Sequence, residues 1–262
     1  DRVDADVLCL QEVTQYIDAG GATHRLLEGI KKAGNYTYAQ FGKTISMETD
    51  MQVKKDVMVK GIFNDWWNWS KGNAILSRIP FAQLGNPTKP GSPRNIPIFK
   101  TGSYGGSRDS EPRFAMLTRL KQPPFPFIVT LHLTTLVGER SPGENPDVTD
   151  QSHNLRAEQI RRFLDLVRVH ILEENHPLIL AGDFNATANE AALAELLVAD
   201  NHFVRISPRD EVPTHPEAEK PLDHIFFYPQ ERLIDYNCWI EAGDLSRRAS
   251  DHLPVVADIH LE

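Results

Sequence analysis

The feature that most constrains the fold is an apolar run that ends abruptly in polar residues. Residues 178–187 read Leu-Ile-Leu-Ala-Gly-Asp-Phe-Asn-Ala-Thr, so Asp183 and Asn185 follow a stretch with the length and composition of a buried strand. Gly182 allows a turn or a close backbone approach that a Cβ would hinder. Strand ends are where α/β proteins place their chemistry, but Asp and Asn are also common turn and helix-cap residues. Taken alone, the segment fits a structural turn equally well.

The same pattern recurs four times along the chain. Strand-like apolar runs include Glu12 in residues 5–13, His132 in 127–133, Asp223 in 221–227 and the pair Asp251-His252 in 249–257. The sequence therefore predicts acids, an amide and imidazoles gathered at the ends of several strands.

The remaining periodicity predicts an alternation of strands and helices. Residues 155–171 have an apolar period near 3.6, with Arg156 and other charged residues on the opposite face, and 189–199 predict a second helix capped by Thr187 or Asn189. The segment 137–153 is expected to be a loop. Strands are predicted near residues 6–13, 73–78, 114–120, 126–133, 177–183, 223–228 and 253–260.

These motifs, in this order, resemble the endonuclease/exonuclease/phosphatase superfamily of DNase I-like metal-dependent phosphoesterases. The resemblance runs from Asp4 to about Ile259, through Gln11-Glu12, the histidine strand, Gly-Asp-Phe-Asn, the acid before a strand and Ser250-Asp251-His252. It implies an α/β (α+β) four-layer sandwich, in which two mixed β-sheets pack face to face with helices outside. Residues 72–78, Gly-Asn-Ala-Ile-Leu-Ser-Arg, are also family-like, although Asn73 and Arg78 are read here as structural.

The resemblance also implies roles for individual side chains. Asp183 is expected to orient and deprotonate the attacking water, and Asn185 to hold the phosphate or stabilise its charge. His132 is expected to donate to the scissile phosphate. His252 is expected to act as general base or as cationic donor, with Asp223 fixing its tautomer and raising its pKa. Arg113 is either a phosphate contact or a surface arginine.

The expected cofactor is Mg²⁺, with Mn²⁺ as an alternative. A hard cation neutralises the anionic oxygens that repel a nucleophile, and Mg²⁺ prefers carboxylate and water oxygens. Glu12 is the first predicted ligand, and Asp251 is the second, directly or through water. The other histidines lack zinc-type spacing, and Cys9 and Cys238 are expected to be separate reduced thiols.

The chain is interpreted as one domain over residues 1–262. Its 262 residues, 40% hydrophobic, can bury one large core, and no linker or long apolar span divides them. Relatives open with an Asn-bearing strand and a helix before the Gln-Glu strand, so we expect these two elements to be missing from this sequence. A signal peptide could have preceded them, which leaves the localisation open.

The substrate is the least constrained inference. The net charge of −8 argues against broad affinity for polyanions but leaves room for a local basic groove, with candidate rims at residues 47–70 and 89–113. Trp66, Trp67 and Trp69 would stack on bases, insert at a membrane surface or pack under a loop. We predict a phosphodiesterase that is nuclease-like, narrowly ahead of a lipid or small-molecule phosphodiesterase or phosphatase. A catalytically silent binding module is the competing class, and the sequence does not predict an oligomeric state.

Overall fold

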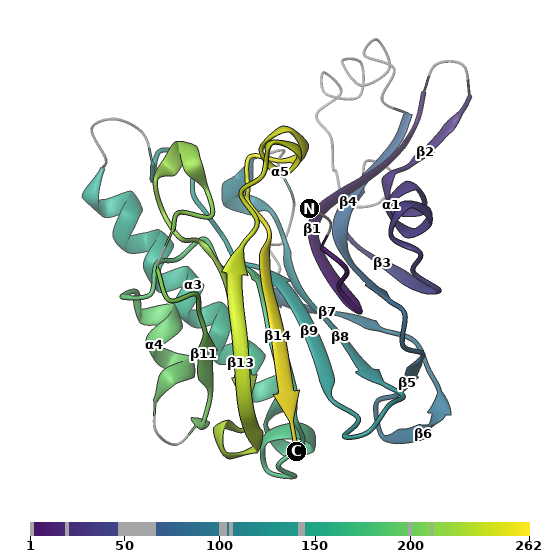
Figure 1. The fold of residues 1–262 in the computed structure, drawn as a ribbon. Coiled ribbons are helices and arrows are strands. Elements are labelled where there is room, and N and C mark those ends of the chain that lie inside the picture. Colours follow the sequence, from purple (N-terminus) through teal and green to yellow (C-terminus); the bar gives the residue numbers. More distant parts are fainter. Residues whose placement is uncertain are drawn as a thin grey trace.

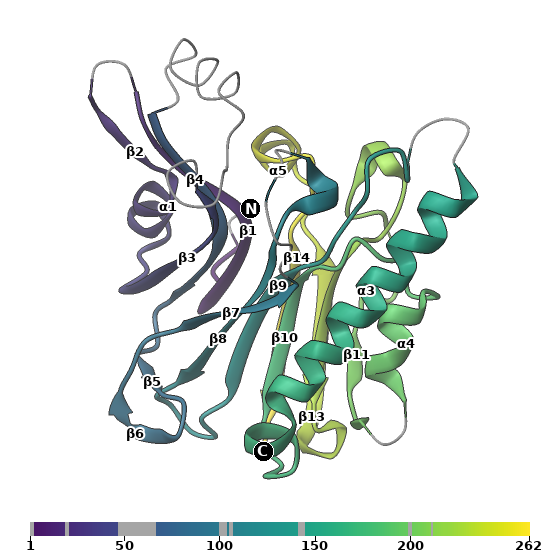
Figure 2. The same cartoon turned by 180° about the vertical axis from the view of Figure 1, so that it is seen from behind.

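The computed structural model describes residues 3–18, 21–46, 67–99, 104, 107–140, 145–198, 201–210 and 212–262. Two β-sheets pack face to face, and helices cover their outer sides (Figures 1 and 2). The predicted DNase I-like sandwich is therefore confirmed. Lys54, Lys55, Lys60, Trp66 and Lys100, which were proposed for the rims, lie outside the described residues.

The smaller sheet has the order β2-β1-β4-β3, and all its described pairs are antiparallel. The larger sheet has the order β11-β12-β10-β9-β8-β5-β6, with β7 also on β8, and is mixed because β9 and β10 are parallel. Strands β13 and β14 form a separate antiparallel ladder. The strands are β1 Val7–Ile17, β2 Thr23–Arg25, β3 Tyr38–Ser46, β4 Trp67–Ser77, β5 Phe81–Gln83, β6 Asn86–Pro90, β7 Arg94–Phe99, β8 Arg113–Leu120, β9 Phe127–His132, β10 Leu178–Asp183, β11 Val204–Ile206, β12 Asp223–Tyr228, β13 Leu233–Ile240 and β14 Val255–Leu261.

Side-chain alternation along the strands produces the layers. Ile75 of β4 packs inward on Met116 and Ile128, while its neighbours Ala74 and Leu76 face α1 on the outside. The outer face of the larger sheet packs against α3 and α4, and β13 and β14 pack on β11 and β12. The helices are α1 Leu26–Gly34, α3 Pro146–Val167, α4 Ala191–Leu197 and α5 Asp244–Ala249; short turns are η1 Arg108–Ser110, η2 (a π-helical turn) Arg168–Leu172, η4 Pro216–Ala218 and η5 Gln230–Arg232.

Helix α3 differs from its prediction in two ways. It begins at Pro146, because Asn145 caps it by accepting from the backbone N–H of Asp147 and proline is favoured in a first turn, so the loop expected over 137–153 is wrong from residue 146 onward. Arg156, expected on the polar face, is fully buried and pairs with Glu139 at 2.8 Å and Glu190 at 2.6 Å. A buried cation needs such partners to offset its loss of hydration.

Helix α4 begins at Ala191, and neither predicted residue is its cap. The cap position is Glu190, whose Oε1 accepts from the backbone N–H of Thr187 at 2.9 Å. Glu190 therefore connects the chain after Asn185 to the buried Arg156.

Gly182 lies where β10 touches both its neighbours. Its φ is 152°, and a Cβ at this position would meet the carbonyl oxygen of Leu131 on β9 at 2.0 Å. Only glycine permits this approach. It brings the ends of β9 and β10 together, so that His132 and Asp183 are register partners.

Both cysteines are free thiols, as predicted. Within the described residues no helix is long and apolar enough to cross a membrane. No second strand of the described structure pairs with residues 7–13 of β1 on the side away from β4. The strand and helix expected upstream stay a prediction.

Candidate active site

Asp183 and Asn185 form a tight turn at the end of β10. Asp183 is 7% exposed, and its Oδ1 accepts from the backbone N–H of Asn185 at 2.8 Å, which is helped by the left-handed φ of 50° at Asn185. The Asn185 amide nitrogen donates to the Leu133 carbonyl at 3.0 Å and to Asp183 Oδ2 at 3.1 Å. Burial first, and then the nearby charge of Asp223, raise the pKa of Asp183.

His252 and Asp223 form a hydrogen-bonded pair beside Asp183. His252 Nδ1 lies 2.7 Å from Asp223 Oδ2, and its Nε2 lies 4.0 Å from Asp183 Oδ2. Burial alone would lower the pKa of His252, but the hydrogen bond and charge of Asp223, with the charges of Asp183 and Asp251, raise it to about 9. This imidazole is therefore a cation at neutral pH, which favours the cationic donor over the general base.

His132 is held in the opposite protonation state. Arg113 Nη1 lies 2.9 Å from His132 Nδ1, and because a guanidinium only donates, Nδ1 accepts and the proton lies on Nε2. Burial, followed by the charges of Arg113 and Lys71, lowers the pKa of His132 well below its usual value. His132 is thus a neutral imidazole, with Nε2 located 3.4 Å from Asp183 Oδ2.

Arg113 is buried beside His132, in the lining of a pocket that also contains Glu12 and Lys71. Its side chain is 2% exposed and also faces Glu111 at 3.5 Å. It is therefore not a surface arginine, and its Nη1 supports His132 from within the protein. Its role as a phosphate contact stays a prediction. The position at the first residue of β8, on the inner part of the sheet, explains this burial.

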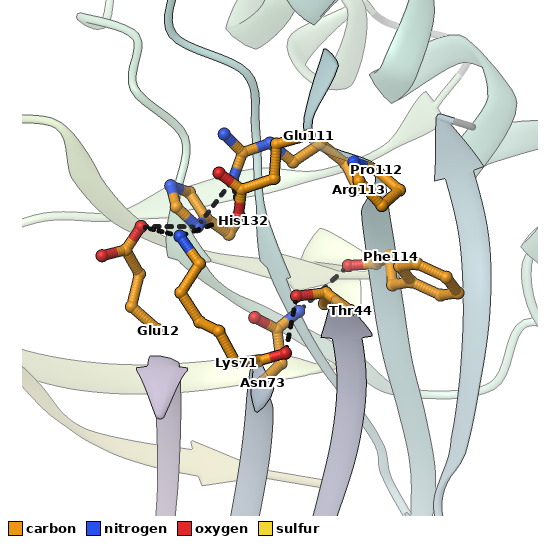
Figure 3. Close-up of a pocket in the computed structure, with 9 residues that line it drawn as sticks. All are labelled: Glu12, Thr44, Lys71, Asn73, Glu111, Pro112, Arg113, Phe114 and His132. Atoms are coloured by element: carbon orange, nitrogen blue, oxygen red, sulfur yellow. Dashed lines mark hydrogen bonds and ion pairs between the residues drawn. The ribbon is translucent and has the colours of Figure 1, made fainter. Parts of the chain in front are cut away.

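Glu12 projects from a bulge in β1. The pairing with β4 shifts between Leu10 and Val13, and Glu12 has a φ of 55°, which turns its carboxylate out of the regular alternation. Glu12 Oε1 accepts from Lys71 Nζ at 2.8 Å and lies 3.8 Å from His132 Nδ1. The close-up in Figure 3 shows these side chains facing one another. Lys71 Nζ also pairs with Glu111 at 2.8 Å. Burial would lower the pKa of Lys71, but the two carboxylates raise it above its usual value.

Asp251 is exposed and lies on the His252 side of the site, where Ser250 Oγ donates to it at 3.3 Å. Among the described residues, two groups of three possible ligands have their atoms within 4.8 Å: Asp183 with Asp223 and His252, and His215 with Asp251 and His252. Glu12 belongs to neither group. A cation bound in either group would have to displace a proton from His252.

The residues present fit a hydrated Mg²⁺ bound by few carboxylates. Glu12 is 56% exposed and offers a hard oxygen ligand, and Mg²⁺ keeps waters and substrate oxygens in its remaining positions. The ammonium of Lys71 occupies one side of that carboxylate. A cation at Glu12 therefore competes with a side chain of the protein itself.

Several residues around the site were not predicted from the sequence, because none of them lies within a recognised motif; Lys71 only precedes the segment 72–78. Thr214 Oγ1 accepts from the backbone N–H groups of Leu222 and Asp223 at 2.9 and 3.0 Å, and its carbonyl accepts from Leu253 N at 2.7 Å. Thr214 thereby joins the two segments that hold the His252 pair. The others are Lys71, Glu111, Arg140 and His215, whose ring packs edge-on against His252 with centroids 4.7 Å apart.

Comparison with known proteins defines the class of protein. The model of the Endonuclease/Exonuclease/phosphatase family matches residues 1–252. The chain belongs to this family, whose members are generally phosphoester hydrolases. No curated protein sequence matches it.

Solved structures share the fold at low sequence identity. An endonuclease/exonuclease/phosphatase from Beutenbergia cavernae is 22% identical with a TM-score of 0.64, covering 98% of this chain but only 62% of its own length. The human Nocturnin catalytic domain with bound sulfate is 17% identical with a TM-score of 0.59, and the match covers 98% of this chain and 81% of that domain. Beta toxin from Staphylococcus aureus is 17% identical with a TM-score of 0.62, and the match covers 97% of this chain and 86% of the toxin chain.

Proposed function

We propose that this chain is a Mg²⁺-dependent phosphodiesterase that uses in-line attack by water, without a covalent enzyme intermediate. The observation behind the proposal is the convergence of two histidines in opposite protonation states on one buried carboxylate: neutral His132 at 3.4 Å and cationic His252 at 4.0 Å from Asp183 Oδ2. Paired groups with pKa values moved apart by their surroundings are typical of acid–base and electrostatic catalysis.

Asp183 is proposed as the base. Its raised pKa makes it a better proton acceptor, and Asn185 fixes its orientation. The carboxylate takes a proton from water, the water oxygen forms a bond to phosphorus, and the bond from phosphorus to the leaving oxygen breaks. The Nε2 hydrogens of His132 and His252 donate to non-bridging oxygens, where negative charge increases in the transition state. Bound Mg²⁺, held by Glu12 with Asp251 as a second contributor, would stabilise the leaving oxygen.

The substrate is proposed to be a phosphodiester, with a nuclease-like activity ahead of a lipid or small-molecule phosphodiesterase or phosphatase. A solved structure of the same fold holds a sulfate, an anion with the shape of phosphate. The net charge of −8 means that a nucleic acid would bind through a local cationic groove. A lipid substrate would instead require apolar contact, for which the tryptophans of residues 66–69 are the candidates.

Turnover assays separate these alternatives. The protein is incubated with bis-p-nitrophenyl phosphate, p-nitrophenyl phosphate, plasmid DNA and sphingomyelin vesicles, each with Mg²⁺ and with EDTA. We expect Mg²⁺-dependent hydrolysis of a diester that EDTA abolishes. Hydrolysis restricted to vesicles would favour the lipid enzyme, and equal rates with EDTA would contradict the metal requirement.

Variants separate the enzyme from a silent binding module of the same fold. His252→Ala is expected to lower turnover by about 10²- to 10⁴-fold, as removal of a proton-transfer or charge-stabilising group does. His260→Ala is the matched control, because His260 pairs with Asp235 on β13 as His252 pairs with Asp223, but at an exposed position. No turnover by the unaltered protein on any substrate would favour the binding module.

A further inference from the structure

Arg140 is a cationic side chain at this site that has unused N–H donors. It lies in the connection between β9 and α3, and its Nη2 donates to Asn185 Oδ1 at 2.6 Å and to the Asn185 carbonyl at 3.2 Å. Within the described residues no carboxylate oxygen lies within 4.0 Å of the guanidinium, and its Nε and Nη1 have no hydrogen-bond partner. The charge of Arg140 nevertheless acts on Asp183 and His132, which places it beside the reacting groups.

The position of Arg140 is fixed by its neighbour. Glu139 is 5% exposed, pairs with Arg156 at 2.8 Å, and accepts from Thr135 Oγ1 at 3.0 Å and from Ser152 Oγ at 2.5 Å. This buried anchor holds the backbone of the connection against α3. The guanidinium of Arg140 is therefore presented to the site in one arrangement, with little ordering left for ligand binding.

The other candidates for phosphate binding are already engaged. Asn185 has two amide hydrogens, and both are used, on Leu133 and Asp183. Arg113 is buried against His132, and Lys71 is shared between Glu12 and Glu111. Arg113 also has an Nε without a partner, but its side chain is 2% exposed. Among the described side chains at the site, Arg140 is the permanently charged group that combines unused N–H donors with partial exposure.

We propose that Arg140 contacts a non-bridging oxygen of the substrate phosphate through these donors, in the role that the sequence assigned to Asn185 and Arg113. The inference deepens the proposed function and rests on it. Because Nη2 is engaged by Asn185, the unused Nε and Nη1 lie on different edges of the guanidinium, and the expected contact is a single charge-assisted hydrogen bond rather than a bidentate pair. Asn185 then acts as a positioning residue that aims both Asp183 and Arg140.

The test measures binding of inorganic phosphate by calorimetry, which requires no turnover. Arg140→Gln is expected to weaken phosphate binding by about 10-fold or more, the cost of losing a charged hydrogen bond, and to raise the inhibition constant of phosphate in the diester assay equally. Arg140→Lys keeps the charge but cannot contact Asn185 and the phosphate in the same arrangement, so it is expected to recover only part of the affinity. Arg162→Gln on α3 is the matched control, because Arg162 pairs with Glu158 at an exposed position.

Each outcome decides one of the two proposals. If Arg140→Gln binds phosphate with wild-type affinity, the proposed role of Arg140 is overturned, but the proposed hydrolase activity is not. If the wild-type protein binds no phosphate, the proposed role of Arg140 is overturned in the same way. Arg140-dependent phosphate binding without turnover of any ester would retain the anion site and remove the hydrolase. If added guanidinium ion restores the phosphate affinity of Arg140→Ala, direct contact is supported. If Arg140→Gln loses phosphate affinity only to the extent that it is thermally unfolded, the role of Arg140 is purely structural.

Discussion

The imidazole of His252 donates Nδ1–H to Oδ2 of Asp223 at 2.7 Å, across the junction between the start of β12 and the segment before β14. These residues are far apart in the sequence, and Thr214 holds their two segments together through backbone contacts on both sides. Because Asp223 stabilises the charged form, the imidazole stays protonated where a free histidine would lose its proton. The pair therefore determines the pH range in which the imidazole of His252 is positively charged.

Asp223→Asn is expected to lower the pKa of His252 from about 9 towards about 6.5, the value of an unperturbed histidine. The cation is lost as pH rises through the pKa, so the variant loses it at lower pH than the wild type does. Titration of the His252 ring signal by NMR measures the shift. Asp235→Asn, which alters the exposed pair with His260, should leave the His252 signal unchanged; an unchanged pKa in Asp223→Asn would show that the pair is not formed.

Asp183 sets the acid side of the pH profile. The ordinary pKa of an aspartate is about 4, and that of Asp183 is raised above it. The carboxylate that accepts the proton from water is therefore protonated at a higher pH than an ordinary aspartate. The rate should therefore decline on acidification earlier than an exposed aspartate would allow. Asp183→Asn should remove this limb and lower turnover by about 10²- to 10⁴-fold, measured as kcat against pH. A variant that keeps both rate and limb would exclude Asp183 as the base.

The strands of the site were predictable because apolar runs mark them directly. The runs predicted near residues 177–183, 126–133 and 223–228 correspond to β10, β9 and β12. Short strands such as β11 and β5 escaped prediction, since three residues contain no period to detect. The prediction that Arg156 lies on the exposed face of α3 was wrong, because periodicity treats every arginine as exposed. It cannot show that Glu139 and Glu190 lie close enough to pair with a buried arginine.

Contacts within the site were less predictable than its members. The sequence brought Glu12, His132, Asp183, Asp223 and His252 to notice, but not that Arg113 would be buried behind His132 or that Lys71 would pair with Glu12. Both contacts join neighbouring strands of one sheet, β8 with β9 and β4 with β1, so they depend on strand register. The position of Glu12 additionally depends on a bulge. The assigned catalytic and metal roles stay predictions.

Glu12→Gln is expected to raise the Mg²⁺ concentration for half-maximal activity by about 10-fold or more, since the neutral amide is a weaker ligand for a hard cation. Gln keeps an oxygen that accepts from Lys71, so the fold should be retained. The Mg²⁺-dependent rise of the thermal unfolding midpoint gives a readout without turnover. Glu28→Gln, on the exposed face of α1, is the control. Equal Mg²⁺ responses in Glu12→Gln and the wild type would place the metal elsewhere.

Gly182→Ala should destabilise the protein more than any exposed substitution. The new Cβ would lie 2.0 Å from the Leu131 carbonyl in a central strand pair, and the φ of 152° adds strain that alanine cannot relieve. Because backbone must move on one side or the other, we expect a loss of about 4 kcal/mol or more in the free energy of unfolding, measured by urea denaturation.

Gly29→Ala is the matched change with the opposite expected sign. Gly29 is exposed within α1, and a Cβ there has no atom within 4 Å, so alanine should stabilise the protein by about 0.5–1 kcal/mol through its higher helix propensity. If Gly182→Ala were insoluble, Gly182→Ser would be too, while Gly29→Ala would express normally. Wild-type stability of Gly182→Ala would mean that β9 and β10 do not approach as closely as described, and the contact between His132 and Asp183 would lose its structural basis.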